Sequence, residues 1–124
     1  MSLDTRLATV VEAARSKKAS RIRLLDVRDI ASFTDTFAFM SGGSDRQNRA
    51  IAEAVEEALK LQGERPISRE GETNGNWVLL DYGNLVIHVM DEDTRRHYNL
   101  EGLWNAGREV ELPAETHPAS DARP

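Results

Sequence analysis

Cysteine is absent from the 124 residues, and no long apolar run is present. Without thiols, the chain can form no disulfide, thiolate nucleophile or thiolate metal site. No stretch approaches the roughly 18 consecutive apolar residues of a membrane-spanning helix. The first residues also lack the apolar centre of a signal peptide. We therefore expect a cytoplasmic protein that does not associate with membranes.

Positive charge is in deficit, because 16 Lys and Arg residues stand against 21 Asp and Glu residues, a formal net charge of −5. A generic nucleic-acid binder draws its affinity from many Lys and Arg contacts to phosphate, so this class is disfavoured. The same charge suits a basic protein partner. Residues 15–28 are locally basic and could touch RNA, but acidic residues interrupt them. We interpret this stretch as a solvated helix end and linker.

The length and composition predict one soluble domain, because 124 residues with 40% hydrophobic content can bury a single core. We place this domain at residues 1–105. Residues 106–124 contain three prolines and few apolar side chains. They are predicted to form an extended, disordered tail with a short extended piece at residues 109–112.

The strongest local pattern lies in residues 77–90, where two apolar runs flank Gly83-Asn84 and predict a tight β-hairpin. Side chains alternate across each strand, so the hairpin has two distinct faces. One face is apolar and is predicted to lie against the core: Val78, Leu80, Tyr82, Leu85, Ile87 and Val89. The other face is mixed: Trp77, Leu79, Asp81, Val86, His88 and Met90.

The remaining elements follow from periodicity and capping signals. Apolar residues at helical spacing predict helices at residues 3–17 and 44–61, the second opened by Ser44 and closed by Gly63. Further strands are predicted at residues 22–27, 34–40 and 66–69. Acids followed by bases after Met90 predict a short helix, with a break around Gly102.

Together these elements predict a single-domain α/β fold, in which a mixed sheet of about five strands carries two long helices and a short C-terminal helix. If both long helices pack on one side, the mixed face of the hairpin is left open. Trp and Met are enriched at protein contact sites, so such a face would bind a partner. The alternative, helices on both faces with Asp81 and His88 satisfied locally, stays open at this stage.

Two patterns could indicate catalysis. Gly42-Gly43-Ser44 before a helix, with Asp91 and Asp93 after a later strand, matches the layout in which nucleotidyltransferases hold triphosphate and magnesium. The two acids also stand where helix N-terminal acids are expected. His88 and Asp81 share a face, but no nucleophile accompanies them, and the three histidines lack metal-ligand spacing. We predict no catalytic residue, metal or cofactor.

Dispersed motifs resemble the Iojap-related ribosomal silencing factors over about residues 3–105. They are Asp26-Val27, Thr34-Asp35 with Phe37, Ser44 with Arg46, Glu70-Gly71, the run from Trp77 to Gly83, His88-Val89-Met90, and Arg95 with Tyr98, Leu100, Glu101 and Trp104. Two departures are the second glycine of residues 41–44 and Gly102.

The resemblance implies a nucleotidyltransferase-like fold without that chemistry. It implies a non-enzymatic protein that binds the large ribosomal subunit through its protein fourteen and blocks joining with the small subunit, which lowers translation under nutrient limitation. A homodimer is implied for the free protein, with no small-molecule substrate and at most incidental contact with ribosomal RNA. The alternatives are a large-subunit assembly factor that uses the same surface, and an active nucleotidyltransferase.

Pattern and resemblance together place the partner-binding surface on the mixed face and the adjoining short helix. The predicted contact residues are Trp77, Leu79, Asp81, His88, Met90, Arg95, Tyr98 and Leu100. Trp77 and Tyr98 are expected to anchor the partner by burial, whereas Arg95 and Asp81 orient it through charge-assisted hydrogen bonds. Leu103 and Trp104 are assigned to the core.

Overall fold

The computed structural model describes residues 4–114. Its elements are α1 (Thr5–Ser16), β1 (Ser20–Asp26), β2 (Thr36–Ser41), α2 (Asp45–Lys60), β3 (Ser68–Glu70), β4 (Trp77–Asp81), β5 (Leu85–Met90), α3 (Glu92–Tyr98), α4 (Leu100–Leu103) and β6 (Arg108–Val110). The strands form one sheet in the order β3-β4-β5-β2-β1-β6. Only the central pair β2 and β5 is parallel. This confirms the predicted α/β fold with a mixed sheet.

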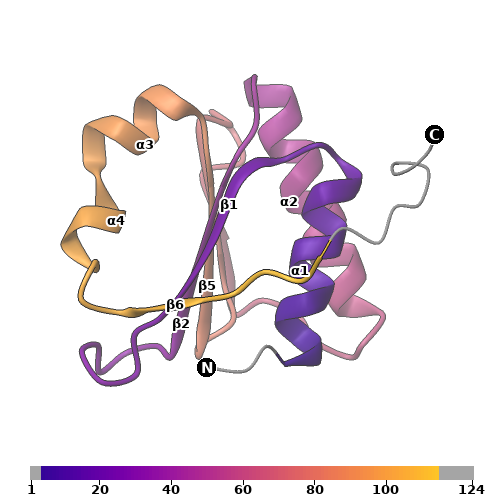
Figure 1. Ribbon diagram of the computed structural model, residues 1–124. Coiled ribbons are helices and arrows are strands. Elements are labelled where there is room, and N and C mark those ends of the chain that lie inside the picture. The colour runs from indigo at the N-terminus through magenta and orange to yellow at the C-terminus, as the bar shows by residue number, and fades with distance from the viewer. Residues whose placement is uncertain (1–3, 115–124) are drawn as a thin grey trace.

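Both long helices, α1 and α2, pack on one face of the sheet (Figure 1). The hairpin strands β4 and β5 contribute to the core beneath them, and the six residues predicted for the core face are all buried there. The predicted register is also confirmed, with Trp77 opposite Met90 and Asp81 opposite Val86. Gly83 has a φ of +86° at the link, a backbone conformation that glycine adopts without steric cost.

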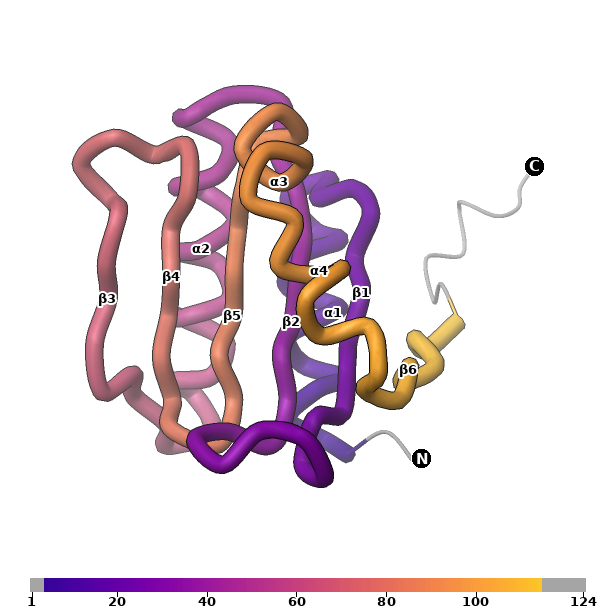
Figure 2. Tube along the Cα trace, turned by 90° about the vertical axis from the view of Figure 1, so that its left-hand side faces the viewer, coloured from indigo at the N-terminus to yellow at the C-terminus, as the bar shows by residue number. Residues whose placement is uncertain are grey.

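The opposite face is covered by a short segment, because α3 and α4 cross in front of β5, β2 and β1 and leave β3 and β4 uncovered (Figure 2). A second apolar cluster lies beneath it, formed by Leu25, Val27, Phe37, Phe39, Val86 and Met90. The prediction of an open face was therefore wrong over β5. His88 retains 4% of its accessible surface and Met90 retains 1%.

Two further differences lie near the C-terminus. Arg108–Val110 forms β6 against β1, so the short extended piece predicted at residues 109–112 is in part a sixth strand of the sheet. Three residues are too few to predict the strand with which they pair. The helix break falls at Asn99, whose φ of 46° is left-handed, and Gly102 lies within α4 instead. The part of the predicted tail from residue 115 onward lies outside the described residues.

The start of α2 is fixed by side chains rather than by the backbone alone. Ser44 caps the helix by accepting a hydrogen bond from the Gln47 N–H at 3.1 Å. Asn48 is fully buried, accepts a hydrogen bond from the Gly42 N–H at 2.9 Å and donates one to the Gly75 carbonyl at 2.9 Å. Asn48 thus joins the loop before α2 to the loop before β4.

We expect Asn48→Ala to lower the free energy of unfolding by about 2 kcal/mol or more, because it leaves two buried backbone groups unpaired at about 1–3 kcal/mol each. Urea denaturation monitored by circular dichroism measures the change. The control is Arg46→Ala, at an exposed position of the same helix turn. Equal stability of the two variants would contradict the bridging role of Asn48.

Candidate partner-binding surface

The uncovered part of the second face consists of β4, β3 and the adjoining end of α3. Trp77, Leu79 and Asp81 lie half-buried along β4, and Tyr98 at the end of α3 is 55% exposed. The rings of Trp77 and Tyr98 have centroids 4.9 Å apart. Leu100 of α4 is half-buried against the cluster beneath. We call these five residues the contact surface. The structure brings them together from three elements.

The position of Trp77 is set by His88 on the neighbouring strand. The Trp77 Nε1–H donates a hydrogen bond to His88 Nδ1 at 3.1 Å. The imidazole is stacked on Phe39, with a centroid distance of 5.1 Å and an interplanar angle of 14°. An indole whose N–H is bonded to a buried imidazole, and whose ring contacts Tyr98, is preorganised, which lowers the entropy cost of binding through it.

His88 does not itself reach the surface, so its assignment as a contact residue needs correction. Burial lowers the pKa of its imidazole to about 4, and the ring is neutral near pH 7. Because Nδ1 accepts the Trp77 hydrogen bond, the proton lies on Nε2, which is buried without a hydrogen-bond partner. Met90, opposite Trp77, is equally enclosed. Both residues support the contact surface from below.

Arg95 was predicted to orient the partner, but its guanidinium is used inside the chain. It is 3% exposed. Its Nε and Nη2 donate to the two Glu101 carboxylate oxygens at 2.7 and 3.0 Å, and Nη1 donates to Ser41 Oγ at 2.8 Å. A further bond reaches the Arg21 carbonyl at 2.8 Å. Arg95 therefore fastens α3 and α4 onto β1 and β2.

Hydrogen bonding from Arg95 holds the pKa of Glu101 below its ordinary value, against the opposing effect of desolvation. Arg23 also donates to Glu101, at 3.3 Å. Two cations thus face one carboxylate that retains only 9% of its accessible surface. We call Arg95, Glu101, Ser41 and Arg23 the arginine clamp.

Two exposed apolar residues were missed by the sequence prediction. Leu103, assigned to the core, is 69% exposed, and Phe33 in the loop between β1 and β2 is 60% exposed. Phe33 contacts Trp104, with ring centroids 5.8 Å apart. The sequence signal that could have indicated an exposed Phe33 was an aromatic residue placed in a predicted loop. Trp104 is half-buried against the second apolar cluster.

The residues that matched a nucleotidyltransferase layout have other roles. The Gly42 and Gly43 N–H groups donate to the side chains of Asn48 and Gln47, so they are not directed at a phosphate. Asp91 caps α3 by accepting from the Thr94 N–H at 2.7 Å. Within residues 4–114, no group of three or more His, Asp or Glu side chains could hold a metal ion. In the same range, no helix is both long and apolar enough to span a membrane.

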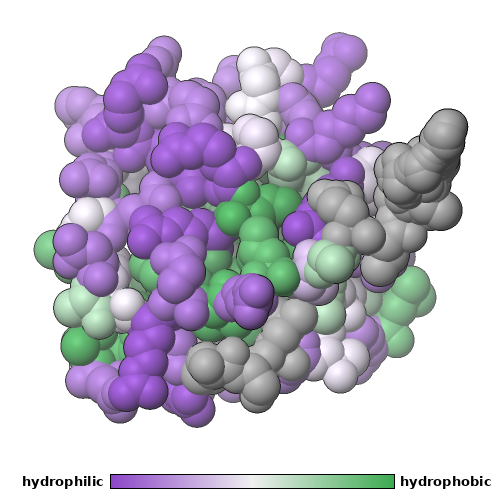
Figure 3. Space-filling model, in the orientation of Figure 1, coloured by the Kyte–Doolittle hydropathy of each residue, from purple (hydrophilic) through white to green (hydrophobic). Residues whose placement is uncertain are grey.

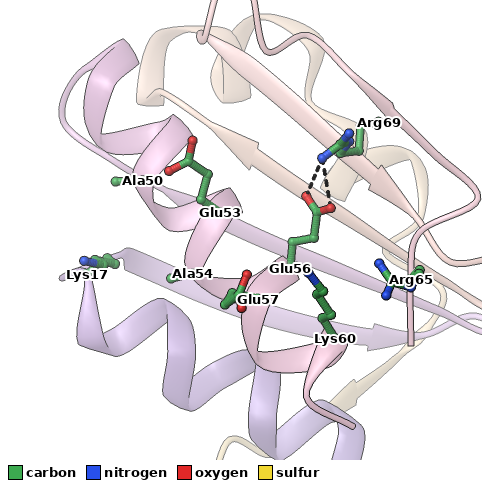
Figure 4. A pocket seen from close by; sticks show the side chains of 9 residues that line it. All are labelled: Lys17, Ala50, Glu53, Ala54, Glu56, Glu57, Lys60, Arg65 and Arg69. Carbon is green, nitrogen blue, oxygen red and sulfur yellow. Dashed lines mark hydrogen bonds and ion pairs between the residues drawn. The ribbon is translucent and has the colours of Figure 1, made fainter. Parts of the chain in front are cut away.

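One hollow lies away from the contact surface. It has a volume of about 670 Å³ and runs beside α2 toward β3. Charged side chains of both signs line it, among them Glu56, which pairs with Arg69 at 2.9 Å (Figure 4). Its walls are largely polar, unlike the mainly apolar pockets that enclose small ligands.

Comparison with known protein families shows the family to which this chain belongs. A family model described as "Ribosomal silencing factor during starvation" matches residues 1–124. This chain belongs to the ribosomal silencing factor family. The family resemblance of the sequence motifs is thereby confirmed. Members of the family regulate the ribosome, and the chain is assigned to that class of regulators.

Individual relatives support the assignment. The ribosomal silencing factor of Halalkalibacterium halodurans is 37% identical over 112 residues, 90% of this chain and 96% of that protein. The mouse protein named mitochondrial assembly of ribosomal large subunit protein 1 is 30% identical over 116 residues, 88% of this chain and 51% of that protein. A crystal structure of a Chromobacterium violaceum protein is similar with a TM-score of 0.80 at 30% identity, covering 98% of both chains.

The burial of His88 predicts that the silencing-factor domain loses stability in mild acid. The unfolded chain protonates its histidine below pH 6.5, whereas the folded chain does so only below about pH 4. Stability therefore falls as the pH drops through this window, because protons bind the unfolded state preferentially. At about 1.4 kcal/mol per pH unit, the full loss is about 3 kcal/mol.

Urea unfolding at a series of pH values measures this loss. His88→Gln should flatten the dependence between pH 6.5 and about 4, whereas His97→Gln, at an exposed position, should leave it unchanged. An unaltered pH profile in the His88 variant would show that the buried imidazole is not responsible.

The arginine clamp gives a third stability prediction. Arg95→Met should destabilise the fold by about 3 kcal/mol, because it leaves Glu101 buried with only Arg23 nearby. Adding Glu101→Leu should recover part of that loss, since the uncompensated carboxylate is then gone. Arg96→Met is the control, because the Arg96 side chain is 70% exposed. Thermal unfolding of all four proteins measures the effect, and no rescue by the second change would argue against a clamp.

Proposed function

We propose that this chain is a non-enzymatic ribosomal silencing factor, which binds the large ribosomal subunit through its protein fourteen and sterically blocks joining with the small subunit. It acts in the cytoplasm and lowers translation under nutrient limitation. The observation that supports this most directly is the family match over residues 1–124, combined with the Trp77–Tyr98 pair at the border of the part of the sheet that α3 and α4 leave uncovered (Figure 2). That pair has the composition of an interface anchor.

The charge around the contact surface favours a basic partner. Asp81 lies on β4 beside Leu79, and Glu70 of β3 is paired opposite Leu79, so both carboxylates flank the same apolar side chain. The Asp81 carboxylate accepts a hydrogen bond from the Gly83 N–H at 2.8 Å, which fixes its direction. A ribosomal protein surface rich in Lys and Arg would complement this arrangement, and electrostatic steering would speed its encounter.

Steric blocking requires affinity and a rigid surface but no reactive group. Trp77 is held by His88, and Tyr98 is carried on a helix fastened by Arg95. Binding would therefore not have to order these anchors first. The glycine N–H groups before α2 are already satisfied by side chains, so the proposal assigns them no phosphate.

A role in large-subunit assembly is the second candidate, and the name of the mouse relative favours it. The same contact surface would then bind precursor particles. Self-association is part of the proposal as well: a homodimer formed through the contact surface would compete with the ribosome. Equal ribosome affinity at protein concentrations below and above those that saturate the dimer would contradict this competition.

We expect Trp77→Ala and Tyr98→Ala each to weaken binding to purified large subunits roughly thirtyfold, because truncation of a central aromatic anchor commonly costs about 2 kcal/mol or more. Co-sedimentation with the subunits measures the affinity. Leu61→Ala is the control, since Leu61 is 82% exposed at the end of α2, away from this surface.

Subunit joining is scored in the same gradients. Loss of joined particles with wild-type protein, and their return with the Trp77 variant, is the result expected for silencing. If the wild-type protein sediments with neither subunit, the proposed function is wrong. An effect on precursor particles alone would favour assembly instead.

A further inference from the structure

The aromatic side chains form one continuous series across the second face of the sheet. It starts at Tyr98, whose ring contacts Trp77, and passes through His88 at 5.9 Å between centroids. His88 contacts Phe37 at 5.5 Å, and Phe37 contacts Trp104 at 5.4 Å. Trp104 then contacts Phe33, which ends the series. The centre of this series is buried, whereas both ends reach the surface.

The end at Phe33 is as exposed as the end at Tyr98. Phe33 is 60% exposed, Leu103 is 69% exposed and Ile30 is 42% exposed, compared with 55% for Tyr98. These residues come from the loop between β1 and β2 and from α4, which lie on the same side of the sheet (Figure 1). Figure 3 shows apolar surface at the left-hand margin, beside α4 and this loop. We call Phe33, Leu103 and Ile30 the Phe33 patch.

Charged side chains of both signs lie near this patch, since Arg108 pairs with Asp29, but an acidic residue, Asp35, stands on the side toward the contact surface. Asp35 is exposed and lies one residue before β2. Because side chains alternate along a strand, it is on the same face of the sheet as Phe37 and Phe39. Phe37 is paired with Val86, and Val86 is paired with Asp81 on its other side. Asp35 and Asp81 therefore lie on the same face, at the end of the sheet that carries the turn between β4 and β5. Basic side chains of a partner that reach Asp81 and Glu70 could therefore also reach Asp35.

We infer that the Phe33 patch is a second anchor of the docking surface, and that it contacts the same basic large-subunit protein as Trp77 and Tyr98. The inference rests on the proposed function. It follows from the continuity of the aromatic series, the exposure of both ends and the two carboxylates, Asp35 and Asp81, at one end of the face between them. A partner seated on both ends would cover α4 and the half-buried Trp104 between them.

The two anchors are joined through packed rings, so they do not act independently. Removing Phe33 takes away a neighbour of both Phe37 and Trp104. Trp104 also contacts Phe37, which contacts His88, the hydrogen-bond acceptor for Trp77. Truncations at the two ends are therefore expected to be non-additive, as is usual for residues coupled through shared neighbours.

The test uses the full chain and purified large subunits. Phe33→Ala and Leu103→Ala should each weaken binding about tenfold. Leu61→Ala and Ile67→Ala are the matched controls, because these residues are 82% and 74% exposed and lie outside the aromatic series. The controls should stay within about twofold of wild type, and thermal unfolding should show all four variants folded. Phe33 and Leu103 lie on different elements, so each tests the inference if the other variant fails to fold.

The outcomes separate this inference from the proposed function. If Trp77→Ala weakens binding while Phe33→Ala and Leu103→Ala behave like the controls, the second anchor is wrong and the proposed function stands. If the Phe33 and Leu103 changes alter self-association in sedimentation velocity but not ribosome binding, a second copy occupies the patch and the inference is overturned. If wild type does not bind the subunit, the proposed function fails first.

Discussion

The placement of both long helices on one face of the sheet is the constraint from which the rest of the structure follows. A six-stranded sheet has two faces to cover, and α1 and α2 cover only one of them. The other is left to α3 and α4, which together span residues 92–103. Such a segment can shield β5, β2 and β1 but cannot reach β3 and β4 (Figure 2). The uncovered strands and the edges of the cover supply every residue of the contact surface.

A cover this short has little apolar area with which to hold itself in place, and the arginine clamp replaces part of that packing. Arg95 of α3 is hydrogen-bonded to Ser41 of β2 and to the Arg21 carbonyl of β1. Its bidentate bond to Glu101 connects α4 to the same strands. Buried ion pairs add little net stability compared with apolar residues of the same size, but they are directional. The clamp therefore determines where Tyr98, Leu100 and Trp104 lie more than how stable the fold is.

What could be predicted from the sequence was local. The register of β4 and β5 follows from a two-residue link and strict alternation, and the start of α2 follows from a serine cap. The burial of His88 and Met90 could not be predicted, because it depends on the direction in which the segment directly after β5, α3 and α4, folds back over the sheet (Figure 2). Arg95 has the same sequence signature whether it faces a partner or Glu101. The pairing of β6 with β1 and the left-handed conformation of Asn99 leave too little pattern in the sequence to be predicted.

The hydrogen bond between Trp77 and His88 limits what the contact surface can recognise. The indole N–H is its single donor, and His88 already accepts it. Trp77 therefore offers a partner only its apolar ring, which supplies burial energy without discriminating among apolar surfaces. Discrimination falls to the polar groups around it, chiefly the carboxylates of Asp81 and Glu70 and the hydroxyl of Tyr98. A partner is thus selected by basic side chains placed to reach these groups while an apolar area covers the indole, and a surface with only one of the two features would bind weakly.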